Sequence, residues 1–255
     1  MLYLIGAGLH SYEDLSLRSI NILKECHKIY YENYTSLQQI PIKDLENYLG
    51  REIVICDREA IETGVNFFEE AKNNKVAILV PGTPMFATTH IDLVLKANEN
   101  KIDYEIIHNA SILNVYGCLG LYSYHFGKTV SIPYFTDTWK PTSFYSNICA
   151  NMKNNLHTLC LLDIKVDENR YMSVNEALEQ ILYCEEELKH GCIKPDTRVF
   201  AICRFGFPDE CIEYGTVEEI KNKNFGAPLH SLVIPSTLDV VEKEIVEYLY
   251  PNLIN

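Results

Sequence analysis

The sequence contains no run of about 18 consecutive apolar residues, so none of its segments is expected to cross a membrane. Its first residues, MLYLIGAGLHS, include no lysine or arginine and no small-residue cleavage site, which argues against a secretory signal peptide. We therefore expect a cytoplasmic protein.

Spacings typical of zinc ligands are also missing. None of the nine cysteines forms a C-x-x-C pair, and the histidines show no ligand spacing. Several cysteines, such as Cys160 and Cys203, lie in apolar runs, which is typical of buried thiols in a reducing compartment. We expect reduced thiols and no metal site.

Basic residues are scarce. Lysine and arginine number 22 against 35 aspartates and glutamates, which gives a formal net charge of −13. Binding along a phosphate backbone needs a Lys/Arg surface, so we expect no nucleic-acid partner. This charge is compatible with a partner protein that has a basic surface.

The first half of the chain alternates short apolar runs with amphipathic segments. The 255 residues, 47% of them hydrophobic, suffice for two soluble domains of ordinary size. Alternating strands and helices indicate βαβ units and a mostly parallel sheet. We predict strands at 2–8, 28–34, 52–57, 75–80 and 103–108, and helices at 16–26, 59–73 and 89–100.

The second half is also of α/β type, with longer loops. We predict strands at 157–166, 198–206 and 230–235, and helices at 173–189 and 237–249. Ser173 is expected to cap the first of these helices together with Glu176. The boundary is placed after Leu113, which gives an N-terminal α/β domain over 1–113 and a C-terminal α/β domain over 114–255.

Two glycines follow the first predicted strand. Gly6-Ala7-Gly8 lacks the third glycine of a dinucleotide fingerprint, because that position is Ser11. The pair fits either a tight turn with positive φ or a backbone that a ligand approaches closely. Ligands of open α/β sheets bind at the carboxyl ends of strands, where this pair lies.

Two further loops follow predicted strands. In PGTPMFATTH, Pro81 and Pro84 fix φ on either side of Gly82, which predicts a stiff loop. Thr88 or Thr89 is expected to cap the next helix. The third loop, NASIL at 109–113, fits a pocket wall or a helix start.

Six segments occur in an order that resembles the diphthine synthase family of the tetrapyrrole methylase superfamily. They are LIGAGL, PGTPMFATTH, HNASILNVYGCLGL, FGKTVSIPYF, LHTLCLLDIKV and GAPLHSLVIP. The resemblance runs from Met1 to about Pro235, and the tract SIPYFTDTWKPTSFY resembles this family rather than the porphyrin and cobalamin enzymes.

The resemblance implies a homodimeric enzyme that transfers methyl groups from S-adenosyl-L-methionine, leaving S-adenosyl-L-homocysteine. Its implied substrate is the modified histidine of translation elongation factor 2, methylated on the amine and, in the eukaryotic branch, on the carboxylate. Its implied fold has two α/β domains with the cofactor in the cleft between them. The residues that match the family's cofactor contacts are Leu9, Thr83, Phe86, Ser111, Ile112, Leu162, Phe205 and His230.

Two positions depart from the family pattern. Thr83 stands where the family has Asp in Gly-Asp-Pro, and Phe205 stands where a smaller residue is commoner before the glycine. No catalytic residue is assigned, although His10, Asp137 and Asp163 are candidate proton acceptors. The aromatic segment 122–145 fits either an entrance for the elongation-factor loop or a dimer interface.

Two alternative functions stay open. One is methylation of a small molecule by a related enzyme of this superfamily. The other is a binding protein of the same fold with impaired cofactor affinity, which the replacement of Asp by Thr83 favours.

Overall fold

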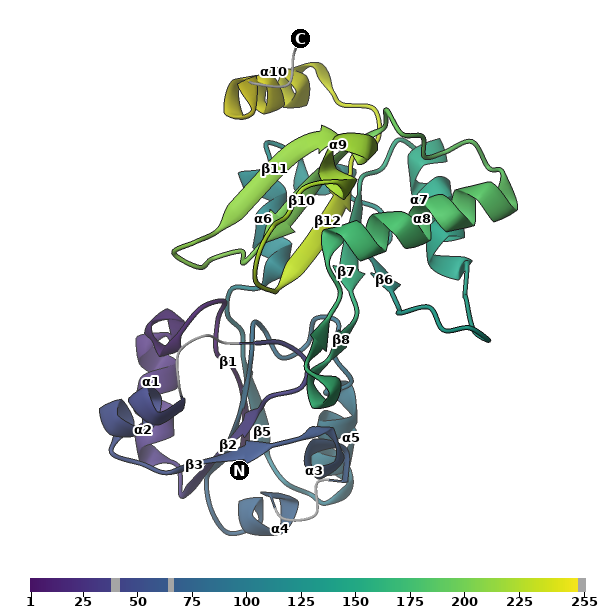
Figure 1. The fold of residues 1–255 in the computed structure, drawn as a ribbon. Coiled ribbons are helices and arrows are strands. Elements are labelled where there is room, and N and C mark those ends of the chain that lie inside the picture. Colours follow the sequence, from purple (N-terminus) through teal and green to yellow (C-terminus); the bar gives the residue numbers. More distant parts are fainter. Residues whose placement is uncertain (38–41, 64–66, 252–255) are drawn as a thin grey trace. The chain divides into compact units, whose positions relative to one another are not determined.

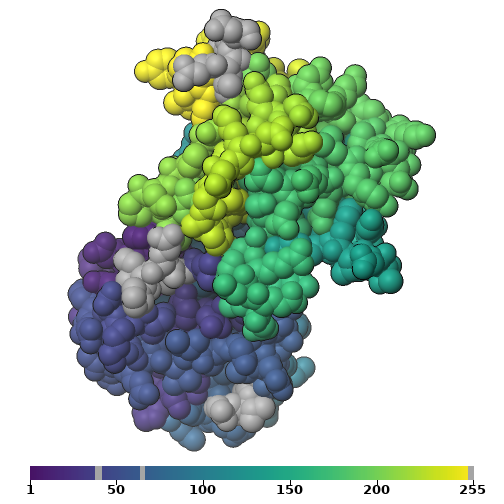
Figure 2. All heavy atoms as spheres, viewed as in Figure 1, coloured from purple at the N-terminus to yellow at the C-terminus, as the bar shows by residue number. Residues whose placement is uncertain are grey.

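The structure, a computed structural model, describes residues 1–37, 42–63 and 67–251. The chain divides into two compact units, the first from Met1 to Leu113 and the second from Asn114 onward (Figure 2). No helix in these described ranges combines the length and the apolar character needed to cross a membrane.

The first unit contains one five-stranded sheet in the order β3-β2-β4-β1-β5, with every pairing parallel (Figure 1). Its strands are β1 (Leu2–Gly6), β2 (Lys28–Glu32), β3 (Ile53–Cys56), β4 (Val76–Val80) and β5 (Tyr104–Ile107). Its helices are α1 (Leu17–Glu25), α2 (Ile42–Leu49), α3 (Arg58–Thr63), α4 (Phe67–Ala71) and α5 (Ile91–Glu99). The predicted parallel sheet is confirmed.

Both faces of this sheet are covered by helices. Leu4 and Ile78 point to the face packed by α3, α4 and α5, whereas Ile5 and Leu79 point to the face packed by α1 and α2. Successive residues of a strand alternate between faces, so a strand buried on both sides reads as a continuous apolar run. This explains VAILV in β4, whose five residues are all buried.

The second unit contains a mixed five-stranded sheet in the order β11-β10-β12-β7-β6, in which only the β6–β7 pairing is parallel. Its strands are β6 (Val130–Ile132), β7 (Thr158–Leu162), β10 (Arg198–Cys203), β11 (Cys211–Thr216) and β12 (His230–Ile234), with a small hairpin of β8 (Ile164–Lys165) and β9 (Arg170–Tyr171). Its helices are α6 (Val115–Cys118), α7 (Ser143–Lys153), α8 (Val174–Leu188), α9 (Val217–Lys221) and α10 (Val240–Leu249).

One face of the second sheet carries the large core with α7, α8 and α9, which includes Ala201 and Leu232 (Figure 1). On the other face Phe200 stacks on Tyr214 with ring centroids 4.4 Å apart, and Tyr250 just after α10 meets Phe200 at 5.5 Å. Neighbouring residues of β10 thus point to opposite faces of the sheet: Ala201 packs in the core with the helices, and Phe200 packs against Tyr214 and Tyr250.

Most predicted elements are present, with differences at helix ends. The capping box of Ser173 and Glu176 is confirmed. The last helix begins at Val240 rather than near Thr237, because Asp239 caps it. The predicted helix 59–73 corresponds to α3 and α4, and its residues 64–66 lie outside the described part of the chain.

The predicted cap of α5 is wrong. His90 occupies the N-cap position and makes no side-chain cap bond. The Thr88 hydroxyl instead donates to the Pro84 carbonyl at 2.5 Å, inside the preceding loop. The same hydroxyl accepts the His90 N–H at 3.5 Å, so its bonds lie before the first turn of α5 and not within it.

Candidate functional site

Three loops of the first unit leave the sheet at one edge. They follow β4, β1 and β5, which are neighbouring parallel strands in the sheet. Because parallel strands end at the same edge, the loops that begin after Gly6, Val80 and Ile107 are brought together. Sequence reasoning predicted a ligand-binding edge here.

Backbone hydrogen bonds join the first two loops. The Gly82 N–H donates to the Gly8 carbonyl at 2.7 Å, and the Gly8 N–H donates to the Gly82 carbonyl at 3.2 Å. Both glycines have positive φ, +85° at Gly8 and +68° at Gly82, a conformation that favours glycine. A Cβ on Gly6 would stand 2.6 Å from the Gly82 carbonyl oxygen, so close contact requires glycine there too.

Asn109 and Asp14 hold the loops in place. The Asn109 Nδ2 donates to the carbonyls of Gly6 and Asp14, both at 3.0 Å. The Asp14 Oδ2 accepts the backbone N–H groups of Leu9 at 2.9 Å and His10 at 2.7 Å. Sequence reasoning missed both residues as organisers of the site; the only available signals were Asn109 at a strand end and Asp14 shortly after the glycine pair.

A buried ion pair lies beneath the second loop. The His90 Nε2 is 3.0 Å from the Glu32 Oε2, and both side chains are fully buried. Neither atom makes a hydrogen bond of normal geometry among the described residues, although each lies beside the other. The His90 Nδ1 lies 2.9 Å from the Pro84 carbonyl, and the Glu32 Oε1 accepts the Thr35 N–H at 2.8 Å. The pair thus connects the loop after β4 to the end of β2.

The first unit brings five of the predicted residues to this edge. Leu9 lies in the loop after β1, and its N–H is already bound to Asp14, so any contact must use its carbonyl or side chain. Thr83 is half-buried, with its Oγ1 accepting the Asn109 N–H at 3.4 Å. The remaining three are Phe86 and Ile112, both half-buried, and Ser111, which is buried.

The second unit brings three predicted residues to one edge of its own sheet. β7 ends at Leu162 and runs antiparallel to β12, which begins at His230. β10 ends at Cys203, the register partner of His230, and Phe205 follows two residues later. The Leu162 side chain is buried in the core of this unit, so a cofactor contact there must use its main chain.

Both ring nitrogens of His230 already have partners. Its Nε2 donates to the Ala227 carbonyl at 3.0 Å, and its Nδ1 accepts the Val174 N–H at 3.4 Å. Burial lowers the pKa of His230, and the nearby positive charge of Arg204 lowers it further, against the opposing effect of the Ala227 carbonyl. His230 is therefore a neutral histidine that orders the strand end.

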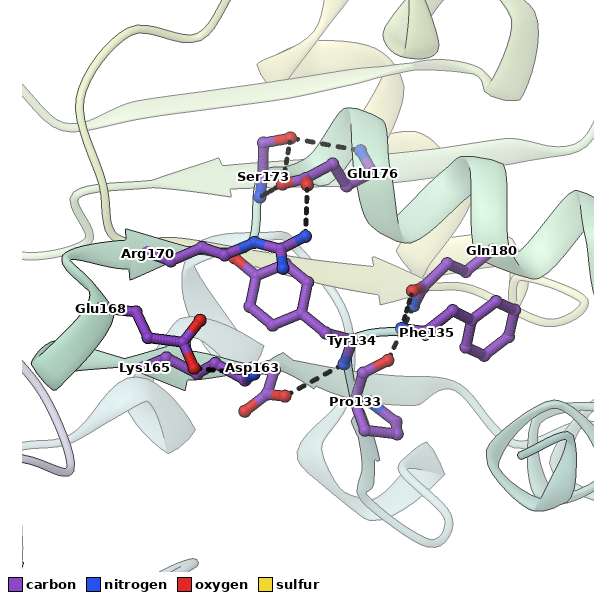
Figure 3. Close-up of polar contacts among 10 residues, drawn as sticks. All are labelled: Pro133, Tyr134, Phe135, Asp163, Lys165, Glu168, Arg170, Ser173, Glu176 and Gln180. Atoms are coloured by element: carbon purple, nitrogen blue, oxygen red, sulfur yellow. Dashed lines mark hydrogen bonds and ion pairs between the residues drawn. The ribbon is translucent and has the colours of Figure 1, made fainter. Parts of the chain in front are cut away.

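Asp163, one of the candidate proton acceptors, has a structural partner (Figure 3). Its Oδ2 accepts the Tyr134 N–H at 3.0 Å. The Gln180 side chain, from α8, accepts the Phe135 N–H at 2.7 Å and donates to the Pro133 carbonyl at 2.9 Å. Residues 133–135 are thus held by hydrogen bonds with both Asp163 and Gln180, so Asp163 has a structural role.

The Arg170 guanidinium lies over the Tyr134 ring, 3.7 Å from its centroid, with Glu176 3.6 Å away (Figure 3). Burial and the charge of Glu176 raise the pKa of Tyr134 to about 12, although Arg170 lowers it in part. The phenol is therefore neutral at physiological pH and cannot serve as a general base. The other two candidate acceptors are Asp137, in an exposed turn of this unit, and His10, half-buried in the first unit.

Three side chains of the second unit approach the geometry of a metal centre. Ligand atoms of His125, His157 and Glu242 all lie within 4.8 Å of one another. The His157 Nδ1 accepts the Ser236 N–H at 3.0 Å, so in a neutral ring the hydrogen is on Nε2, which faces the Glu242 Oε1 at 3.2 Å. A metal at Nε2 would require an imidazolate. The cluster is better described as a buried carboxylate that accepts hydrogen bonds, including the Tyr122 N–H at 2.8 Å.

A cavity of about 330 Å³ lies in the second unit, between α10 and the start of β10. It is lined by Arg198, Tyr214, Leu238, Lys243, Val246, Glu247 and Tyr250. None of these residues was predicted to bind the cofactor, and Arg198 lies at the opposite end of β10 from Cys203.

Known proteins resemble this chain over most of its length. The model of the tetrapyrrole (corrin/porphyrin) methylases matches residues 1–221. The diphthine methyl ester synthase of Saccharomyces cerevisiae is 45% identical over 251 residues, which cover 92% of this chain and 84% of the yeast protein. A solved diphthine synthase gives a TM-score of 0.88 at 30% identity, covering 98% of this chain and 96% of that one.

A second solved structure, from Entamoeba histolytica, gives a TM-score of 0.91 at 40% identity and covers 98% of both chains. Similarity at this level extends over both units and confirms the resemblance inferred from the sequence segments. The chain belongs to the tetrapyrrole methylase family and has its α/β fold.

Proposed function

We propose that this methylase transfers methyl groups from S-adenosyl-L-methionine to the modified histidine of elongation factor 2. The observation that carries the proposal is 45% identity, over 92% of this chain, to a protein named diphthine methyl ester synthase. An ester product requires a carboxylate as the last nucleophile, and earlier methyl groups would go to the amine. A cytoplasmic homodimer is part of the same proposal.

The first sheet edge fits a small ligand that is bound through main-chain groups. Gly82 has no side chain on the side that faces Ser111, and a Cβ placed on the glycine would lie 3.5 Å from the Ser111 Cβ. The loops are held by Asp14, Asn109 and the buried His90, so their amides and carbonyls are fixed before a ligand arrives. Fixed groups reduce the entropy lost on binding. We propose that Leu9, Thr83, Phe86, Ser111, Ile112, Leu162, Phe205 and His230 contact the cofactor.

The chemistry needs little help from acid–base side chains. The bound cofactor supplies an electrophilic methyl group on a sulfonium. An in-line displacement would move this methyl group to the substrate carboxylate and leave the carbon–sulfur electron pair on sulfur. A carboxylate is already ionised at pH 7 and needs no base. The protein contributes alignment of nucleophile, carbon and sulfur, which can supply most of the rate.

Two measurements test the proposal. Binding of S-adenosyl-L-homocysteine to the native protein should raise its melting temperature, because a ligand of the native state stabilises it. The protein should then methylate elongation factor 2 that carries the unmethylated precursor. Absence of binding would favour the impaired binding protein, and methylation of a porphyrin or corrin instead would favour the small-molecule enzyme.

Thr83→Asp should tighten cofactor binding. The Thr83 Oγ1 accepts the Asn109 N–H at 3.4 Å and makes a second long contact, of 3.5 Å, with the His108 Nδ1. A carboxylate there would restore a charged acceptor, and since charge-assisted hydrogen bonds are about twice as strong as neutral ones, we expect roughly tenfold higher affinity. Titration calorimetry with S-adenosyl-L-methionine measures this. Thr83→Asn is the uncharged control, and an equal gain in both variants would contradict the role of charge.

Trp139→Ala should weaken binding of the protein substrate. Trp139 is the single tryptophan of the chain and is 54% exposed. Its turn is closed by two bonds with Thr136, each 3.0 Å long, and the Lys140 ammonium lies 4.5 Å from the Tyr183 ring centroid. A rigid exposed tryptophan loses little entropy on docking, so we expect KM for elongation factor 2 to rise about tenfold.

The matched control for this substitution is Tyr248→Ala, which removes an aromatic side chain that is 83% exposed and lies outside the segment 122–145, so KM should stay unchanged. Affinity for S-adenosyl-L-homocysteine should stay unchanged in both variants. If Trp139→Ala changes the oligomeric state instead of KM, the aromatic segment is a dimer interface.

A further inference from the structure

Arg204 is a buried cation at the end of β10. Its side chain is only 9% exposed, and its backbone has a φ of +52°. Its N–H donates to the Leu229 carbonyl at 2.8 Å, so the residue starts one loop while it lies against another. The first loop carries Phe205 and the second leads into His230.

The guanidinium ties these two loops together. Its Nη1 donates to the carbonyls of Phe225 at 2.8 Å and Ala227 at 2.7 Å. Its Nε and Nη2 donate to the Asp209 carbonyl at 3.3 and 3.1 Å, and Nε lies 2.7 Å from the Asp209 Oδ2. The planar fork of arginine allows all these bonds at once, which a single ammonium cannot do.

The Ala227 carbonyl connects Arg204 to His230. This oxygen accepts the Arg204 Nη1 at 2.7 Å and also the His230 Nε2 at 3.0 Å. A carbonyl has two lone pairs, so both bonds form together and the position of the ring depends on the guanidinium. Burial lowers the pKa of His230 most, and the charge of Arg204 adds to this effect.

We propose that Arg204 is a positioning residue for cofactor binding, because it fixes the loops that carry Phe205 and His230. This inference rests on the proposed function, in which both residues contact the cofactor. Without the guanidinium, four backbone carbonyl bonds are lost and the two loops are free to separate. Most of the core of this unit lies on other residues, but it includes Phe225, whose carbonyl accepts from Arg204, so stability is measured beside binding.

The test measures binding of S-adenosyl-L-homocysteine to the full chain by calorimetry. Hydrogen bonds of charged groups are strong enough that Arg204→Ala should weaken binding about tenfold or more, and Arg204→Lys by about threefold or more. Arg198→Ala, at the opposite end of the same strand, is the matched control and should bind as the wild type does. Melting temperatures of all variants are recorded in parallel.

Chemical rescue separates positioning from general destabilisation. Dilute guanidinium chloride should restore part of the affinity of Arg204→Ala, whereas sodium chloride at the same concentration should not. If Arg204→Ala does not fold, the affinity of Arg204→Lys for S-adenosyl-L-homocysteine tests the inference, since lysine keeps the positive charge but not the fork of hydrogen bonds. Wild-type affinity in either folded variant overturns the inference. Failure of the wild type to bind would reject the proposed function itself, before any substitution is considered.

Discussion

Gly8→Ala is expected to weaken cofactor binding strongly. A Cβ on Gly8 would stand 2.3 Å from the Asp14 Cβ and 2.9 Å from its Oδ2, and the residue has a φ of +85°. To relieve this overlap, either the Asp14 carboxylate, which accepts the N–H groups of Leu9 and His10, or the Gly8 backbone must move. Movement of Gly8 would also break its two backbone hydrogen bonds with Gly82. We expect about 3 kcal/mol of lost affinity, roughly 100-fold in Kd for S-adenosyl-L-homocysteine.

Gly50→Ala is the matched control. Gly50 also has a positive φ of +64°, but nothing lies within 4 Å of the position of its Cβ. Both variants carry backbone strain of about 1–2 kcal/mol, while only the first carries the overlap. Gly50→Ala should therefore lose some stability and keep its affinity. Equal affinities in the two variants, measured by calorimetry, would show that the Gly8 loop does not hold the cofactor.

His90→Ala is expected to destabilise the first unit severely. It leaves the fully buried Glu32 carboxyl group without the imidazole that lies 3.0 Å from its Oε2. Removal of one partner of a buried ion pair costs about 3–5 kcal/mol of unfolding free energy. For a chain of this size we expect a melting temperature about 10 °C lower. Thermal unfolding followed by circular dichroism measures the effect.

Glu32→Gln is the informative companion variant. Both ring nitrogens of His90 face oxygen atoms, Nδ1 the Pro84 carbonyl and Nε2 the Glu32 carboxylate. With glutamine, a neutral ring donates from Nδ1 to the Pro84 carbonyl and accepts the amide at Nε2, while Thr35 keeps its acceptor. Glu32→Gln should therefore cost much less than His90→Ala. Similar losses in both, or wild-type stability of His90→Ala, would contradict the role of this buried pair in holding the loop after β4.

Much of the fold was predictable because it depends on local patterns. The run VAILV in β4 is apolar at every position, which is typical of a strand buried on both faces of a parallel sheet. Ser173 and Glu176 form a capping box that spacing alone predicts. The order of six short segments, from LIGAGL to GAPLHSLVIP, was enough to indicate the family that the comparisons confirmed.

Elements with mixed patterns were missed. The helix α7 reads SFYSNICANMK, in which aromatic residues, Asn and Cys favour helix only weakly. The strand β11 is half-buried along most of its length and shows no clear alternation. The antiparallel pairings of the second sheet were not predictable either, since strand direction leaves no local signature.

The sequence by itself determined where strands end, where glycine is needed and to which family the chain belongs. Only the tertiary structure decided which side chains hold those strand ends. Asn109 donates to the Gly6 carbonyl, and His90 lies against the Glu32 carboxyl group. Arg204 donates to the Ala227 carbonyl, which also accepts from His230. The physical reason is that periodicity and turn chemistry act between neighbours in the chain. A buried polar group takes the partner that folding brings within about 3 Å, however distant that partner is in sequence.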